Sequence, residues 1–265
     1  MKVAVLDINH PDLKPNLKMG MNFTSSIASE FGDRNGHGTH CAGIIAGCDN
    51  DTGVVGIAPQ AELYVAKVLG DDGSGTINGI INGIDWAISQ KVDIISMSLG
   101  ASVNPGAAFH SAMKRARAAG IVIVAASGNE NSHVSWPAAY DKVIVVGAVD
   151  QTLGRAGFSN FGKELDIDAP GVDTYSTYPI NKYAKYSGTS MATPMVSGVV
   201  ALVQAYTSKT GVKATPEVIM NMIKQRSVDL GDMGDAMFGN GLVNIYKLIK
   251  GQSLRPAEGL FFLYK

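Results

Sequence analysis

Short runs rich in Val, Ile and Ala alternate along this chain with segments of helical period, and no other feature constrains the fold as strongly. Such runs are typical of strands in a parallel sheet covered by helices on both sides. The sequence therefore predicts an α/β fold, a three-layer αβα arrangement with a mainly parallel central sheet. The predicted strands cover residues 2–7, 61–69, 92–98, 121–126 and 142–149.

Apolar residues at spacings of three and four indicate the helices between these strands. After Ser74, isoleucines recur at this spacing up to Ile88, which predicts a helix capped by Ser74. The segment 105–119 repeats the pattern, and Gly120 is placed to end that helix in the left-handed region. Two more helices are predicted over residues 189–207 and 216–226.

The chain of 265 residues contains no linker, internal repeat or low-complexity tract. This predicts one domain over residues 1–250, followed by a tail, residues 251–265, that packs on the same domain. Because the tail ends in apolar and aromatic residues, strand addition to a groove or to a neighbouring chain is the alternative.

Composition and charge exclude several classes of function. Lys and Arg total 22 against 23 Asp and Glu, with no block of like charges, so we expect no nucleic-acid partner. No apolar run reaches the roughly 18 residues that a membrane span needs, so we expect no membrane partner. No secretory signal precedes the first strand, so the chain is either cytoplasmic or has lost a leader.

Cys41 and Cys48 lie in one predicted helix. They are about 10 Å apart there, which is too far for a disulfide.

Polar residues that follow apolar strands are the first candidates for a site, because ligands of open parallel sheets bind beyond the carboxyl ends of the strands. Asp7 closes the first predicted strand, where it is either a functional carboxylate or a cap for the following turn. Asn129 follows the strand 121–126, where it either makes a turn or donates its amide hydrogens to an oxyanion.

His37 lies between Gly36 and Gly38 at the predicted start of a helix. The glycines let the backbone turn sharply and present the imidazole. His37 and His40 have the spacing of metal ligands, although no further ligand pair appears in the sequence. The other interpretation is a general base whose charge a carboxylate such as Asp7 stabilises, with His40 in a structural role.

Ser190 lies just inside the predicted start of another helix and follows Gly188 and Thr189. Backbone N–H groups converge at such a position and the helix dipole favours a developing anion, which suits a nucleophile. The alternative is that Ser190 or Thr189 only caps the helix. Together with Asp7 and the preceding candidates, Ser190 completes the set of nucleophile, base, orienting acid and oxyanion donor.

Several longer motifs carry a resemblance to a known family. The runs 37–43 and 188–194, the Ser-Met-Ser-Leu-Gly run at 96–100, and the pair of runs 67–69 and 73–75 resemble the subtilisin family of serine endopeptidases. The resemblance extends from Val3 to about residue 244, and the chain order Asp, His, Ser agrees with it. It implies that residues 1–250 form a subtilisin-like peptidase domain.

By position, the resemblance implies the role of each catalytic residue: Asp7 orients, His37 is the general base, Ser190 is the nucleophile, and Asn129 is the oxyanion donor beside the Ser190 N–H. It also implies that an extended substrate pairs with backbone on both sides of a cleft. The residues implied for that pairing are Gly73, Ser98, Leu99 and Gly100.

The resemblance further implies a roomy, uncharged pocket for the residue before the cut, with a preference for large apolar or aromatic side chains. The implied lining is Ala125, Ala126, Ser127 and the stretch near Ser135. The implied partners are protein or peptide substrates and a propeptide or proteinaceous inhibitor.

The chain departs from the family pattern around Asp7. His10, Pro11 and Asp12 follow it after two residues, so the loop is several residues shorter than in the family, and only six residues precede Asp7. A catalytically impaired pseudoprotease that binds peptides or a partner is therefore the alternative function. Cys41 directly follows the second histidine, as in the thiol-containing branch, and we expect it to be a buried small residue rather than a nucleophile.

Calcium is the cofactor that the resemblance implies. Residues 49–53 lie where subtilisins carry a calcium loop, and hard oxygen ligands of this kind suit Ca²⁺. The ligands implied are the side chains of Asp12 and Asn50 and the backbone carbonyls of Cys48, Thr52 and Val54. Glu164 and Asp166 resemble a second, weaker cation site, and a solvated surface pair is the alternative there.

Overall fold

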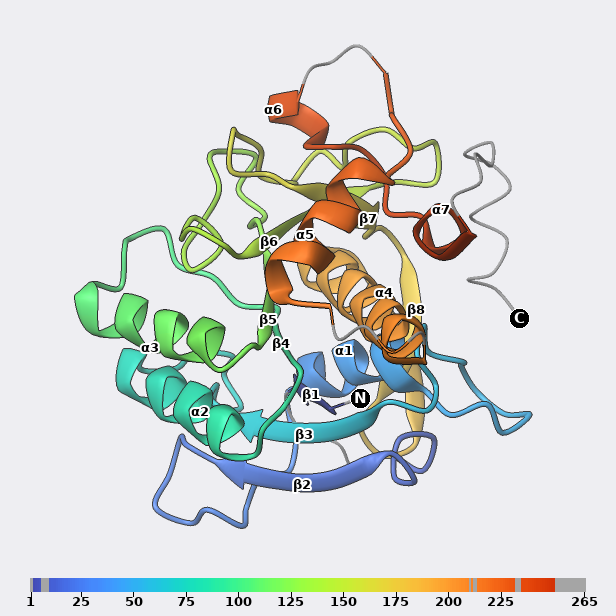
Figure 1. The fold of residues 1–265 in the computed structure, drawn as a ribbon. Helices are drawn as coiled ribbons and strands as arrows, with labels where there is room; N and C mark the ends of the chain where they lie inside the picture. The colour runs from blue at the N-terminus through green and yellow to red at the C-terminus, as the bar shows by residue number, and fades with distance from the viewer. Residues whose placement is uncertain (1, 6–9, 210, 212–213, 232–234, 251–265) are drawn as a thin grey trace.

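The computed structural model describes residues 2–5, 10–209, 211, 214–231 and 235–250. Its centre is a seven-stranded sheet in the order β2-β3-β1-β4-β5-β6-β7, in which neighbouring strands are parallel (Figure 1). Its strands are β1 (Lys2–Val5), β2 (Leu17–Asn22), β3 (Glu62–Lys67), β4 (Ile94–Met97), β5 (Val122–Ala126), β6 (Ile144–Val149) and β7 (Ile167–Pro170).

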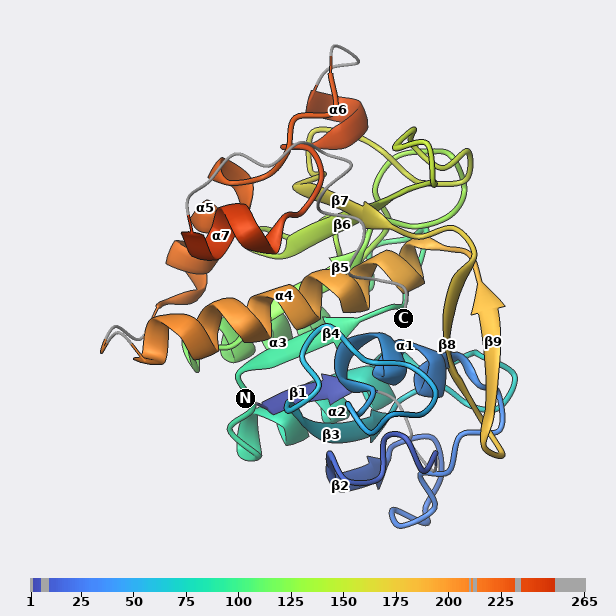
Figure 2. The same ribbon diagram turned by 90° about the vertical axis from the view of Figure 1, so that its right-hand side faces the viewer.

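Helices cover both faces of this sheet. On one face, α1 (His37–Ala46) packs against α4 (Thr189–Lys209), which runs across the strands from β4 to β7 (Figure 2). On the opposite face, α2 (Ile77–Ser89) packs against α3 (Ala107–Ala118). A separate cluster of buried apolar side chains fills each of the two interfaces. The prediction of a three-layer αβα fold with a parallel central sheet is confirmed.

The remaining elements surround these layers. An antiparallel hairpin lies beside α1 at the edge of the molecule (Figure 2). Within the described part of the chain, three shorter helices follow α4. These elements are β8 (Thr174–Tyr178), β9 (Lys182–Tyr186), α5 (Pro216–Gln225), α6 (Asp235–Phe238) and α7 (Ile245–Lys250).

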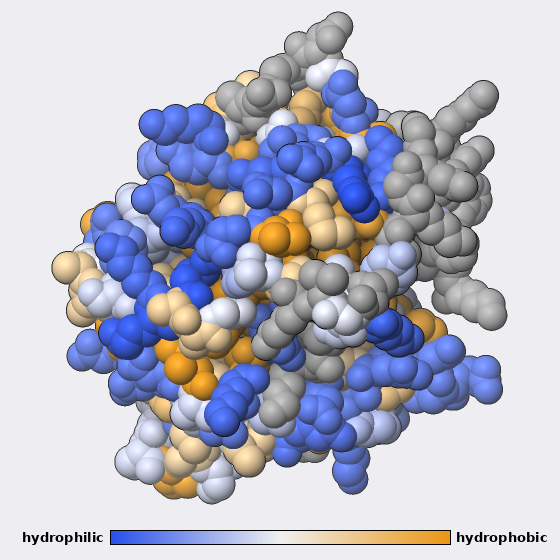
Figure 3. Space-filling model, in the orientation of Figure 1, coloured by the Kyte–Doolittle hydropathy of each residue, from blue (hydrophilic) through white to orange (hydrophobic). Residues whose placement is uncertain are grey.

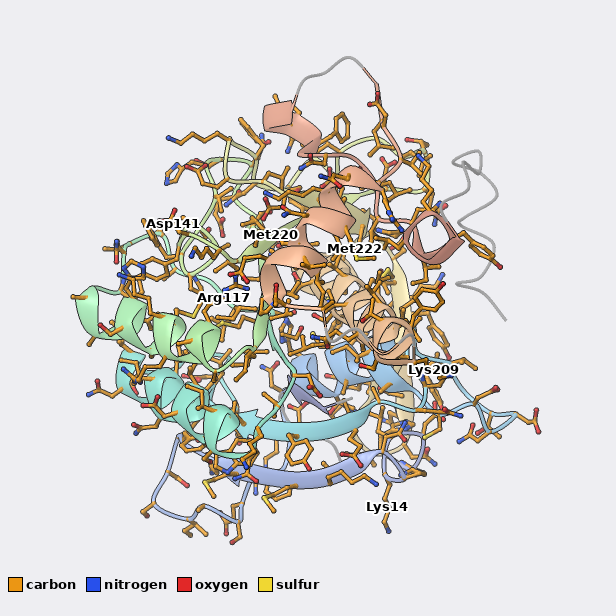
Figure 4. All side chains as sticks on the ribbon, viewed as in Figure 1. Lys14, Arg117, Asp141, Lys209, Met220 and Met222 are labelled. Atoms are coloured by element: carbon orange, nitrogen blue, oxygen red, sulfur yellow. The ribbon has the colours of Figure 1, made fainter. Side chains whose placement is uncertain are left out.

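An ion pair joins α3 to α5. Arg117 reaches from α3 toward α5 (Figure 4), where its Nη2 donates to Glu217 Oε1 over 2.6 Å. Burial lowers the pKa of Arg117, and the charge of Glu217 opposes that shift. Glu217 therefore compensates a guanidinium that is largely removed from water.

The predicted elements match the observed ones, with shifts at their ends. The helix predicted to be capped by Ser74 begins after Thr76, whose Oγ1 accepts the Gly79 N–H over 3.0 Å. Ser74 is not free to cap it, because its hydroxyl donates to Asp72. Gly120 follows α3 with a φ of 82°, in the left-handed region as predicted. β2 was not predicted, because its sequence lacks β-branched residues and it is only partly buried.

The other expectations have mixed outcomes. The helix that begins at His37 ends at Ala46, so the prediction that Cys48 lies within it is wrong. Both cysteines are free and buried.

Asp7 and the tail 251–265 lie outside the described residues. Among the described helices, none combines the length and apolar character needed to cross a membrane.

The outer surface is of mixed polarity on the face shown in Figure 3. Hydrophilic residues cover most of this face, and apolar residues lie between them in small patches. Such mixing is usual, because a folded chain has too little polar surface to cover itself completely.

Asp168 is a carboxyl group buried within β7, with 0% of its surface exposed. Neither of its side-chain oxygens has a hydrogen-bond partner among the described residues. Oδ1 occupies the space that a side chain on Gly147 of the neighbouring strand would need. Burial raises the pKa of Asp168 to about 7, and the charge of Arg155 opposes this rise. The folded protein therefore favours the uncharged acid.

Asp168 is expected to make the stability of the fold depend on pH. Because its pKa in the folded state lies above the ordinary value of about 3.9, its contribution to stability is complete below about pH 4 and is lost as the pH rises through about 7. Asp168→Asn cannot ionise. Its free energy of unfolding, relative to that of the wild type, should therefore rise by up to roughly 4 kcal/mol between pH 4 and pH 8. Urea denaturation of both proteins at the two pH values measures this difference; a constant difference would contradict the expectation.

Candidate active site

The starts of α1 and α4 meet beyond the carboxyl ends of β4 and β5. The Cys41 thiol of α1 donates to the Ser190 carbonyl of α4 over 3.3 Å. A cleft of about 550 Å³ passes the start of α1. The fold brings five of the predicted site residues into the lining of this cleft: His37, Gly73, Ser98, Leu99 and Gly100. The predicted orienting acid, Asp7, lies outside the described residues.

Asp33 holds the loop that presents His37. Its Oδ1 accepts the Gly36 N–H over 2.8 Å, and its Oδ2 accepts the N–H and the hydroxyl of Thr39 over 2.8 and 2.7 Å. Gly36 has a φ of 96°, and the ring of Tyr178 fills the space that a side chain there would need. Asp33 thus satisfies backbone donors at the start of α1 that the helix itself leaves free.

The two histidines of α1 have different surroundings. Burial lowers the pKa of His37, and the negative charge of Asp33 opposes this shift. His40 is fully buried, and burial lowers its pKa to about 4. Its Nε2 lies 3.1 Å from the Ala184 carbonyl, and its ring stacks on Tyr186 at a centroid distance of 4.8 Å. These contacts fit the structural role expected for His40.

The carbonyl of Ser190 is held from outside its own helix. Within α4 it would accept the N–H of residue 194, but Pro194 has none. Ser98 Oγ donates to this carbonyl over 2.9 Å and Cys41 Sγ over 3.3 Å. Burial raises the pKa of Cys41 to about 12, so the thiol keeps its hydrogen. Ser190 is therefore fixed to the end of β4 and to α1.

Asn129 is positioned by the start of α4. Its Oδ1 accepts the N–H and the hydroxyl of Thr189 over 2.8 and 3.0 Å. Its Nδ2 has no acceptor among the described residues. A Cβ built on Gly188 would lie 3.6 Å from Asn129 Nδ2 and 3.7 Å from the Ser190 N, so both donors border one small space. Asn129 Oδ1 lies 3.7 Å from the same point, but it already accepts from Thr189. Two N–H groups near one position are the kind of donors that stabilise an oxyanion.

The residues predicted to line the pocket for the residue before the cut lie at the end of β5. Ala125 pairs with Met97 of β4, the residue before Ser98. Ala125 and Ser127 are fully buried, and Ala126 is nearly so. The Glu130 Oε2 accepts the Ser135 hydroxyl over 3.3 Å, so one carboxylate lies next to the expected lining. The roomy, uncharged pocket stays a prediction.

The residues predicted as calcium ligands lie together around Asp12, which is 2% exposed. Asn50 Nδ2 and the Val54 N–H donate to its two carboxylate oxygens over 2.9 and 3.1 Å. Asn50 Oδ1 accepts the N–H and hydroxyl of Thr52, and the Cys48 N–H donates to the backbone carbonyl of Asp12. The carbonyls of Cys48, Thr52 and Val54 accept no hydrogen bond from described residues. The set thus holds one carboxylate, one amide and three carbonyls, which are the classes of oxygen group that Ca²⁺ takes as ligands. Among the described residues, no group of three or more His, Cys, Asp or Glu side chains could hold a metal ion.

At the second suggested cation site, a side chain supplies the positive charge. Lys224 Nζ lies 2.5 Å from Asp166 Oδ1, and Asp166 Oδ2 accepts the Val145 N–H over 2.9 Å. Burial raises the pKa of Asp166, and these contacts with Lys224 and Val145 oppose the shift. The interpretation as a solvated surface pair is wrong, because Asp166 is 7% exposed and paired with an ammonium.

Some site residues were not predicted. Asp33 has the sequence signal of a helix cap, because it is an acidic residue shortly before a helical segment, but it is not among the predicted site residues. Glu130 follows the predicted Asn129 directly and was not singled out. Apolar side chains also line the cleft, and their positions on separate elements leave no local signal: Ile77, Ile80, Pro105, Phe109 and Trp136.

Asp33→Ala is expected to lower the free energy of unfolding by about 1–2 kcal/mol, because it removes the cap of α1. Asp33→Asn keeps one acceptor oxygen, so its free energy of unfolding should fall by less. Thermal denaturation measures the stability, and hydrogen exchange of the Gly36 and Thr39 amides reports the lost contacts. Asp72→Ala is a matched control, because Asp72 contacts only an exposed turn. Equal losses from the two alanine variants would contradict the expectation.

Comparisons with known proteins place this arrangement in a family. The model of the subtilase family (Peptidase_S8) matches residues 1–241. Subtilisin DY of Bacillus licheniformis is 44% identical over 254 residues, which cover 92% of this chain and 89% of the relative. Subtilisin BL of Lederbergia lenta is 46% identical over 249 residues, 92% of this chain and 88% of the relative. An intracellular serine protease of Paenibacillus polymyxa is 45% identical over 258 residues, 92% and 78% of the two chains. The chain therefore belongs to the subtilase family and is a subtilisin-like serine endopeptidase.

Proposed function

We propose that this endopeptidase cleaves peptide bonds through Ser190, with His37 as the general base and Asn129 as an oxyanion donor. The observation that carries the proposal is the pair of N–H donors, Asn129 Nδ2 and the Ser190 backbone, which border one space beside Gly188. Because Thr189 holds Asn129 Oδ1, the Nδ2 group is oriented before any negative charge develops.

The first chemical step is attack of Ser190 Oγ on the scissile carbonyl carbon while its proton moves to the His37 ring. Burial lowers the pKa of His37, which favours the neutral ring that is able to accept that proton. The charge of Asp33 favours the imidazolium that forms, and the family pattern assigns Asp7 to orienting the ring. His37 then protonates the leaving amine, and water releases the acyl group from Ser190 by the same route.

The cleft suits an extended protein or peptide substrate. Gly73 lines it, and so do Ser98, Leu99 and Gly100 from a second, separate segment of the chain. A substrate in strand conformation would add between these two segments through backbone hydrogen bonds. A propeptide or a proteinaceous inhibitor would occupy the cleft in the same extended form.

An active-site probe tests the proposed nucleophile. A fluorophosphonate should label the wild-type protein, because its phosphorus forms a bond to an activated serine oxygen. Ser190→Ala should remove the label completely, and His37→Ala should slow labelling by at least about 100-fold, since proton transfer is lost. Gel fluorescence with intact-mass measurement reads the outcome.

Ser187→Ala is a matched control, since this exposed serine precedes α4 and should leave labelling unchanged. A folded wild-type protein without labelling would favour the pseudoprotease alternative. The comparisons give that alternative no support, because the relatives are named as subtilisins and proteases.

We also propose that Ca²⁺ binds at Asp12, with Asn50 and the carbonyls of Cys48, Thr52 and Val54. A ligand that binds only the folded state at 100 times its Kd stabilises it by about 2.7 kcal/mol. Millimolar Ca²⁺ should therefore raise the Tm of the wild type, and EDTA should reverse the rise. Asp12→Asn should abolish the response, whereas Asp51→Asn, at an exposed position outside the ligand set, should keep it. A wild-type Tm that changes neither with Ca²⁺ nor with EDTA would refute the site.

A further inference from the structure

Strand β8 of the hairpin donates two side-chain hydroxyls to the first turn of α1. Thr177 Oγ1 donates to the Thr39 carbonyl over 2.8 Å. Ser176 Oγ donates to the His40 carbonyl over the same distance. Both hydroxyl-bearing side chains are 0% exposed, and a side chain on Gly43 would collide with both of them. Since a buried hydroxyl without an acceptor is costly, these two bonds fix how α1 lies on β8.

Tyr178, at the end of β8, restrains the residues before His37. Its ring fills the space that a side chain on Gly36 would need. Its hydroxyl donates to the Asn35 carbonyl over 3.3 Å. The two β8 hydroxyls hold the carbonyls that follow His37. β8 therefore restrains the main chain on both sides of the proposed general base.

Strand β9 connects this contact to the proposed nucleophile. The Ala184 carbonyl of β9 lies 3.1 Å from His40 Nε2, and the His40 ring stacks on Tyr186. β9 ends at Tyr186, and Ser190 follows within the first turn of α4. The hairpin lies beside α1 along its length (Figure 2). It is thus bonded to the helix of the base and continuous in sequence with the helix of the nucleophile.

The direct hydrogen bond between α1 and α4 is the weaker restraint. It joins Cys41 Sγ to the Ser190 carbonyl over 3.3 Å, and a thiol is a poor donor. Proton transfer requires the His37 ring to lie within hydrogen-bond reach of Ser190 Oγ. A misplacement of about 1 Å can slow such a step by about 100-fold. The buried hydroxyl bonds to the hairpin therefore bear on the rate as well as on the stability.

We infer that Thr177 and Ser176 are positioning residues of the peptidase, which hold His37 at the correct distance from Ser190 through α1. The inference rests on the proposed function, because it assigns the base and the nucleophile to these two side chains. The β8 hydroxyls are bonded to the main chain of α1, so they act on the reaction through the place that α1 takes.

The experiment removes one hydroxyl and measures the chemistry separately from substrate binding. Thr177→Val keeps the branched shape without the donor, and Thr177→Ser keeps the donor. Ser89→Ala is the matched control, because Ser89 Oγ also donates to a helix carbonyl, that of Trp86 in α2 over 2.6 Å, on the opposite face of the sheet. The readouts are kcat and KM for a peptide p-nitroanilide, and the rate at which a fluorophosphonate labels Ser190. Circular dichroism shows that each variant is folded at the assay temperature.

Thr177→Val should lower kcat and the labelling rate together by at least about fivefold, because His37 is displaced from Ser190. KM should stay within about twofold of the wild type, since an interaction that acts only on the chemical step changes kcat. Thr177→Ser should restore most of both rates. Ser89→Ala should leave kcat, KM and the labelling rate unchanged.

The labelling separates failure of this inference from failure of the proposed function. A folded wild type without labelling overturns both. With a labelled wild type, a folded Thr177→Val that keeps its kcat and labelling rate overturns the positioning role alone. Equal losses in Thr177→Ser or in Ser89→Ala overturn it as well, because the hydroxyl would then not be the cause. Should Thr177→Val fail to fold, Ser176→Ala decides by the same criteria.

Discussion

The carbonyl oxygen of Ser190 is the point on which the geometry of the site depends. Pro194 removes the helical donor that this oxygen would otherwise have, and Ser98 and Cys41 replace it. These bonds are partly buried, where a carbonyl without a donor is costly, so the two replacement bonds stabilise the folded state. They come from the end of β4 and from α1, so the start of α4 is fixed to two other parts of the fold. An ordinary residue at position 194 would satisfy the helix internally and release this constraint.

The parallel sheet explains why a few contacts suffice to assemble the site. Carboxyl ends of parallel strands meet at one edge, so Ser98 after β4 and Asn129 after β5 start from fixed neighbouring positions. Thr189 then links this edge to α4, because its N–H and its hydroxyl both donate to Asn129. The proposed oxyanion donors therefore come from two elements that share a rigid framework. Such preorganisation is what makes a dipole effective toward a developing charge.

Patterns that are local to the chain were sufficient to predict the strands β1, β3, β4, β5 and β6 and the long helices, because short apolar runs and helical spacings are visible in the sequence itself. β5 and β6 are buried along their whole length, which explains their continuous apolar runs. Roles that depend on distant partners were not predictable in the same way. The contacts of Glu130 have no local signal, because its donor Asn160 belongs to another loop. The sequence predicts Ser74 as a helix cap, because nothing local shows that its hydroxyl donates to Asp72. Asp33 had a local signal, but its contacts with the start of α1 appear only in the folded structure.

The pair of Lys224 and Asp166 has a consequence for how this molecule responds to its surroundings. The ammonium is part of α5, so it cannot diffuse away or be removed by a chelator, and its local concentration is set by the fold. Docking of α5 at this carboxylate, next to the backbone of β6, therefore tolerates changes in dissolved divalent ions. The chain thus supplies the counter-ion of Asp166 itself, in the form of Lys224. The contact between α5 and this carboxylate therefore depends on the sequence and not on a dissolved cation.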